Sequence, residues 1–325
     1  MVAVLEYLTS PQGALAFILS FAVVTGVAAE LLNARLMRWV RTQPWVQRMI
    51  PLQRNMMLNF GFPESACSDE MCLEMYCIVL IVCGNHLVMG LAMAPVTALG
   101  WEAAGEAGRL LFVMGGLGDV AYCVYDWIKC FCRTFLPETC QFWGAPFPMR
   151  YFVVLCVLHH SASMSLTVPM LTCHPEMREF HLIGISLLLA AAICFLTGAY
   201  KFTLNTRLRF DMLQYKAIVL VQLITIWFTR VGVWFTQAFS AIATFYARGE
   251  TAFLIGAVVA GLLMSVFNIL MIMDATTAAR KWLPRPLPVE HHTAAQAQKD
   301  KKAERDAVHC HEASPARLRR RVAHM

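Results

Sequence analysis

Charge is scarce in this sequence. Only 15% of its 325 residues are charged and 58% are hydrophobic, against roughly 25% charged and 45–50% apolar in soluble domains. The mean hydropathy is +0.55. This composition excludes an ordinary water-soluble globular protein, because so much apolar surface needs a bilayer as well as a core to cover it.

Long apolar runs recur through most of the chain. Seven of them are long enough to cross a hydrocarbon layer of ~30 Å, and they cover residues 13–32, 75–99, 110–131, 151–172, 181–200, 217–238 and 252–273. The sixth run has no strong breaker before Phe245, so it can extend that far. We therefore predict an all-α polytopic membrane protein with about seven transmembrane helices.

Basic residues collect in alternate connections between these runs, which is the pattern that the positive-inside rule demands of real spans. The basic connections are those after the first, third and fifth runs, followed by the C-terminal tail; they carry Arg35, Arg38, Arg41, Arg48 and Arg54, then Lys129, Arg133 and Arg150, then Lys201, Arg207, Arg209 and Lys216. The charges predict an N-terminus on the lumenal or outer side and a cytosolic C-terminus.

Disulfides and glycosylation are nearly excluded on the lumenal side. Of the 12 cysteines, only Cys173 faces the lumen in this topology, and no lumenal connection contains an N-x-S/T acceptor. Both absences argue against a seven-span receptor. Cys130, Cys132 and Cys140 lie together near the cytosolic face, where S-palmitoylation and metal binding stay open, although their spacing matches no zinc pattern and favours free thiols.

Three segments follow from this pattern. Residues 1–70 hold the first span and a basic cytosolic loop, residues 71–280 form a six-helix membrane domain, and residues 281–325 form a basic tail that is too polar to build a core. Arg317, Arg319, Arg320 and Arg321 in the tail could contact anionic lipid headgroups at ~1 kcal/mol per charge. We expect membrane lipids as partners and no nucleic acid, and a homo-oligomer stays open.

Ionisable residues inside the spans are few: His86, Asp119, Asp126, His159, His160 and Arg230. Such groups are costly in hydrocarbon and mark functional sites by default. Asp119 and Asp126 are seven residues apart and share a face of the third span. On the fourth span, helical spacing places Cys156, His160, Ser163 and Thr167 on one stripe, with His159 beside it.

The depths of these groups match. At ~1.5 Å per residue, the two carboxylates bracket the histidines of the neighbouring antiparallel span. A carboxylate that accepts an imidazole N–H fixes the tautomer and raises the basicity of the ring, as a general base needs. The alternative is that these groups only neutralise one another. His86 is expected to have no partner, and one histidine pair supplies too few ligands for a metal.

The order of these residues resembles a known family. Tyr122, Tyr125 and Asp126 in AYCVYDWI, followed by His159 and His160 in VLHHSASMS, are similar to the landmarks of the TLC domain, which ceramide synthases, TRAM proteins and several lipid-regulating membrane proteins share. The resemblance covers about residues 70–280. Its weaker matches are Asn205 and Arg207 in FTLNTR, Arg230 in FTRV and Asn268 in FNILM.

The resemblance implies a barrel formed by the last six helices around a polar, lipid-accessible cavity. It assigns catalytic roles to His159, His160, Asp126 and Asp119, and lipid contacts to Tyr122, Tyr125, Ser163, Thr167, Arg230, Asn205 and Arg207. No cofactor or metal is implied, and acyl-CoA is the substrate if the protein is a ceramide synthase-like N-acyltransferase.

The chain departs from the synthases, however. Residues 180–201 contain no acid where many family members carry one. We therefore expect a protein that binds or handles lipid and influences membrane lipid composition or trafficking. Acyl transfer is the second expectation. A transporter or a non-catalytic scaffold also stays open, although Pro95 and Pro169 do not form the repeated breaks typical of transporters.

Overall fold

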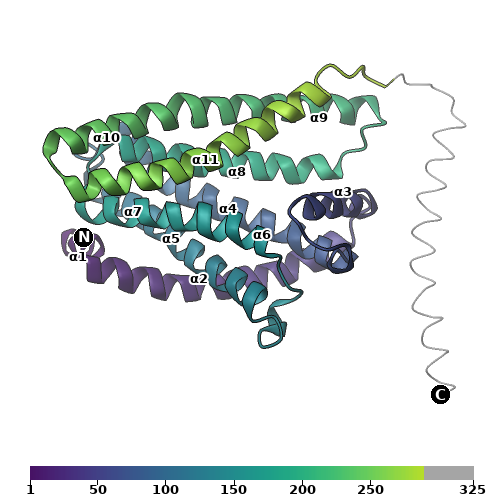
Figure 1. Cartoon of the computed structure of the whole chain (residues 1–325), viewed down its shortest axis with the longest axis horizontal. Helices are drawn as coiled ribbons and strands as arrows, with labels where there is room; N and C mark the ends of the chain where they lie inside the picture. Colours follow the sequence, from purple (N-terminus) through teal and green to yellow (C-terminus); the bar gives the residue numbers. More distant parts are fainter. Residues whose placement is uncertain (289–325) are drawn as a thin grey trace, which may run out of the picture.

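The structure is a computed structural model of the whole chain and describes residues 1–288 (Figure 1). No strand occurs in this part, and seven helical spans are long and apolar enough to cross a membrane. The prediction of an all-α, multi-pass membrane protein is confirmed. The arginine cluster of the tail lies outside the described residues.

Four of the spans are single helices that begin and end close to the predicted runs: α2 (Pro11–Arg41), α4 (Asp69–Leu99), α5 (Gly105–Phe135) and α8 (Arg178–Thr203). The last span, α11 (Thr251–Trp282), is also unbroken. Most of these helices extend past the apolar run into polar sequence. Ser10 and Ser68 start α2 and α4 by accepting the N–H groups of Gly13 and Met71.

The fourth and sixth spans each contain a π-helical stretch. The fourth consists of α6 (Met149–Phe152), the π-helix η3 (Val153–His160) and α7 (Ser161–Cys173). The sixth consists of α9 (Arg209–Ile226), the π-helix η4 (Trp227–Phe235) and α10 (Thr236–Arg248). π-Helices are rare, and they occur frequently at functional sites.

Short elements complete the described chain. The helix α1 (Val2–Thr9) precedes the first span, and the 3-10 turns η1 (Glu64–Ala66) and η2 (Gln141–Trp143) lie in connections. The helix α3 (Val46–Asn59) was not predicted, since that segment was assigned to a basic loop. Its buried residues, Val46, Met49, Ile50, Gln53 and Met57, form one face that packs on α4 and α8.

Six spans form a closed ring. Going round it, α4 packs on α5, α5 on α7, α7 on α11, α11 on α9 and α10, these two on α8, and α8 again on α4 (Figure 1). The first span, α2, lies outside the ring against α5 and α4. The third span, α5, is the most enclosed, with 61% of its apolar window buried, because α2 covers the side that faces away from the ring.

Candidate functional site

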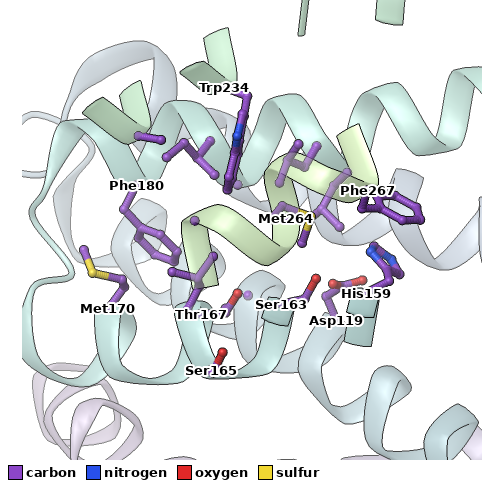
Figure 2. Close-up of a pocket in the computed structure, with 18 of the residues that line it drawn as sticks. Asp119, His159, Ser163, Ser165, Thr167, Met170, Phe180, Trp234, Met264 and Phe267 are labelled. Atoms are coloured by element: carbon purple, nitrogen blue, oxygen red, sulfur yellow. The ribbon is translucent and has the colours of Figure 1, made fainter. Parts of the chain in front are cut away.

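A cavity of about 360 Å³ lies inside the ring, and all six spans contribute to its wall (Figure 2). Its walls are mainly apolar and aromatic, and include Met170, Phe180, Trp234, Met264 and Phe267. Polar side chains enter it from α4, α5, the fourth span and η4. Small-molecule sites in proteins typically have volumes of about 300–1,000 Å³ and this mixed lining.

The cavity exists because many of the residues around it are small. Glycine or alanine occupies ten lining positions: Gly116, Gly184, Gly256, Gly261, Ala190, Ala191, Ala238, Ala241, Ala252 and Ala257. Gly261 shows the effect most clearly, since it is buried and a methyl group added there would meet no atom within 4 Å. Gly256 has the same open space, whereas at Gly116 and Gly184 a methyl group would collide with Leu171 or Met93. The open space is therefore clearest beside the glycines of α11.

His86 and Asp119 form a pair on the cavity wall. His86 Nδ1 lies 2.9 Å from Asp119 Oδ1, and Asn85 Nδ2 donates to the same oxygen at 3.1 Å. The expectation that His86 has no partner is wrong. That expectation considered pairing only between the third and fourth spans. In the structure, α4 packs against α5 and brings His86 to the depth of Asp119.

His159 also faces the cavity, together with Ser163 and Thr167 from the next turns of the span (Figure 2). Its ring stacks on Phe267 with centroids 4.6 Å apart. The Nδ1 atom of His159 is buried and has no hydrogen-bond partner among residues 1–288. The side chain of His159 thus lies in the cavity wall, and its Nδ1 is unpaired within the described chain.

His160 points elsewhere. Its Nε2 lies 2.8 Å from Asp126 Oδ2, and both side chains are buried outside the cavity. Asp126 and His160 come together as their depths suggested. The predicted stripe through Cys156, His160, Ser163 and Thr167 is wrong, however, because only Ser163 and Thr167 line the cavity. The π-helix η3 turns each residue through a smaller angle than an α-helix does, so the stripe breaks at its end.

Arg230 lines the cavity from η4, near the middle of the sixth span. Its Nη1 donates to Asn268 Oδ1 on α11 at 3.0 Å, and the Asn268 side chain is completely buried. Arg230 in FTRV and Asn268 in FNILM, two of the weaker points of resemblance to the TLC domain, are therefore in direct contact.

The two tyrosines assigned to lipid contact lie outside this cavity. Tyr122 and Tyr125 border a second space of only about 10 Å³, between α2, α4 and α5, which is about the size of one water molecule. Tyr125 donates to Glu30 of α2, and Lys129 Nζ donates to the same carboxylate at 2.6 Å. Glu30 lies two residues before the end of the first apolar run, and the sequence alone predicted no role for it.

Asn205 and Arg207 also lie apart from the cavity, in the connection between α8 and α9. The backbone N–H of Asn205 donates to Asp211 Oδ2 at 2.8 Å, and the backbone N–H of Arg207 donates to Asn205 Oδ1 at 3.2 Å. These bonds organise the start of α9. The lipid contacts that the resemblance assigned to these two residues stay predictions.

The far end of the cavity lies under two turns. His174, between α7 and α8, approaches Glu250, between α10 and α11, with Nε2 and Oε2 2.9 Å apart. The ring of His174 packs on Phe245 and Phe253, which both line the cavity. This cluster joins the turn between α7 and α8 to the turn between α10 and α11, at the end that the loop charges predict to be lumenal.

The arrangement can hold an elongated molecule with a polar group near His159, Asp119 and Arg230. Within residues 1–288 no group of three or more His, Cys, Asp or Glu side chains is placed to hold a metal ion. Comparison with known proteins finds no matching family model, no similar curated protein and no similar solved structure.

Proposed function

We propose that this protein binds a lipid inside its six-helix ring and thereby influences the lipid composition or trafficking of its membrane, which we assign to the endoplasmic reticulum or another endomembrane. One observation carries the proposal: the cavity wall is mainly apolar, and its ionisable side chains, His86, Asp119, His159 and Arg230, lie toward the end away from Phe180 and Phe245. An amphiphilic molecule has the same division.

The dimensions support a lipid chain as the occupant. On α8 the lining residues run from Phe180 to Phe195, which is about 22 Å at ~1.5 Å per residue. One leaflet of the hydrocarbon core is about 15 Å thick, half of ~30 Å. The cavity is therefore long enough for a single lipid chain, and its volume lies near the lower end for ligand sites.

Filling the cavity provides the first test. Gly261→Leu adds a buried side chain where nothing lies within 4 Å, and it replaces a weak helix former with a strong one. We expect the variant to fold and to lose crosslinking to a photoactivatable, single-chain lipid probe in detergent-solubilised protein. The measurement is the probe-labelled fraction, with the labelled peptide identified by mass spectrometry.

Gly84→Leu is the matched control. Gly84 is exposed on α4, outside the cavity, and it also has open space around it. It should crosslink like the wild type. Equal labelling of wild type and Gly261→Leu would show that the probe binds the outer surface, and the proposal would fail.

A cellular experiment tests the wider role. In cells that lack the protein, we expect a change in the lipid profile that wild type restores and Gly261→Leu does not. A broad phospholipid change supports lipid handling. A change confined to N-acylated sphingoid lipids supports acyl transfer instead.

Acyl transfer is the second candidate, because His86 and Asp119 form an imidazole–carboxylate pair on the cavity wall. The carboxylate holds the imidazole in one orientation, as a general base requires. In a ceramide synthase-like reaction, the imidazole would accept the proton from the attacking amine while CoA thiolate leaves the acyl carbon. His86→Gln should then abolish acyl-CoA-dependent amide formation by purified protein and leave probe crosslinking intact.

A further inference from the structure

Three cationic side chains are buried in the part of the chain that the structure describes, and two of them have a carboxylate partner. Lys129 Nζ lies 2.6 Å from Glu30 Oε1, and Arg133 Nη1 lies 2.5 Å from Glu74 Oε1. The third, Arg230, is only 4% exposed. It differs from the others in its partners.

No carboxylate of residues 1–288 lies within ion-pair distance of Arg230. Its hydrogen bond goes to the neutral Asn268 side chain, and its Nε is buried without a partner in this region. A guanidinium has five N–H donors and stays protonated in proteins. The charge of Arg230 and its remaining Nη1 and Nη2 donors therefore have no partner in the described chain, and a molecule in the cavity can supply one.

The carboxylate of the cavity wall does not neutralise the charge of Arg230. Asp119 is the one carboxylate on the cavity wall in the described chain, and its Oδ1 already accepts from Asn85 and lies against His86. A buried charge without a partner costs several kcal/mol in a low-dielectric environment. An anionic group of a bound molecule would remove that cost.

We propose that the ligand of this cavity is a single-chain anionic amphiphile whose carboxylate or phosphate is held by Arg230, with its chain directed toward Phe180 and Phe245. This inference rests on the proposed function and adds the chemical class of the ligand. Arginine suits both head groups, because its planar donors bind two oxygens of a carboxylate or phosphate at once. Asn268 fixes the guanidinium from the side away from the ligand.

Competition binding to purified full-length protein in neutral detergent tests the inference without any substitution. The probe is radiolabelled palmitic acid, and the competitors are unlabelled palmitic acid, hexadecyl phosphate, hexadecanol and sodium acetate. We expect the two long-chain anions to compete at least about tenfold better than hexadecanol, because only they can pair with Arg230. Acetate should not compete at matched concentration.

Substitution then locates the effect. Arg230→Gln should lower the affinity for palmitic acid to that for hexadecanol and leave hexadecanol binding unchanged, while Arg230→Lys should keep part of the preference. Arg248→Gln makes the same change in charge on an exposed residue of the same span and should bind like the wild type. Hexadecanol binding reports that each variant has folded.

The outcomes separate the two proposals. Equal competition by palmitic acid and hexadecanol in the wild type overturns the anionic ligand and leaves lipid binding standing. Effective competition by acetate also overturns it, since the site would then take small anions. Failure of every long-chain compound to bind overturns the proposed function itself.

Discussion

Two imidazole–carboxylate pairs lie within the spans of the described chain, and both carboxylates come from α5. Asp119 joins α5 to His86 of α4, and Asp126 joins it to His160 of the fourth span. Only the first pair lines the cavity. The second is enclosed by packed residues, so its main effect is to hold two spans in register.

Asp126→Leu tests that structural role. The substitution removes the acceptor of His160 but keeps most of the bulk, and an unpaired buried polar group costs about 1–3 kcal/mol. We expect a lower thermal unfolding midpoint in detergent, measured with a thiol-reactive or tryptophan reporter. Asp126→Asn can still accept a hydrogen bond and should lose less. If the two variants unfold like the wild type, the pair does not stabilise the bundle.

Sequence alone could place some of these groups and not others. Depth along antiparallel spans predicted that both carboxylates of α5 lie beside the histidines of the fourth span; Asp126 does meet His160, whereas Asp119 pairs with His86. It could not show that His86 meets Asp119, because the contact depends on which spans are neighbours in the ring. It also assigned His159 and His160 to one site, whereas the two rings face different surroundings.

The two π-helical stretches contribute His159 and Arg230 to the polar surface of the cavity. η3 ends in His159 and His160, and η4 contains Arg230 and Trp234. Both stretches contact α11. Hydrophobic spacing predicts that a span crosses the membrane, but a change from α to π winding does not alter composition, so the orientation of His160 relative to Ser163 could not be predicted.

The attachment of α2 to the ring depends on few polar contacts, and the Glu30–Lys129 pair is one of them. A double-mutant cycle with Glu30→Leu and Lys129→Leu measures it. We expect each single variant to be destabilised by leaving the other charge unpaired, and the double variant to be more stable than the sum predicts, by about 1 kcal/mol or more. Additive effects on unfolding would mean that the pair contributes nothing between the helices.

The helix α3 was not predicted, although its sequence has helical spacing. Its buried positions recur at helical spacing, from Val46 through Met49, Ile50 and Gln53 to Met57, so the pattern was present in the sequence. Arg48 and Arg54 lie among these positions, and their charges led to the prediction of a basic loop. The apolar spans were easier to predict because their composition alone distinguishes them.

At the scale of the whole molecule, the last six spans of the described chain surround the large cavity, and the first span lies outside them. The orientation of this assembly in the membrane is a prediction from loop charge. Two cysteines at opposite ends of the fourth span make it testable, since Cys173 is exposed at the end of α7 and Cys140 is partly exposed between α5 and α6.

Single-cysteine variants in sealed endomembrane vesicles, labelled with a membrane-impermeant maleimide, give the measurement. With a cytosolic C-terminus, Cys140 should label in intact vesicles, and Cys173 should label only after the membrane is permeabilised. The reverse pattern would invert the predicted orientation. Labelling of both residues in intact vesicles would contradict the span count.

The pairing of Glu30 with Lys129 also has a consequence for synthesis. The two residues are separated by 99 positions, and at about 5–20 residues per second the ribosome needs roughly 5–20 s to add them. During that interval the first span has been made but its carboxylate has no partner. The growing chain therefore has to keep the first span beside the insertion site, with Glu30 near the aqueous boundary, until the third span arrives to receive it.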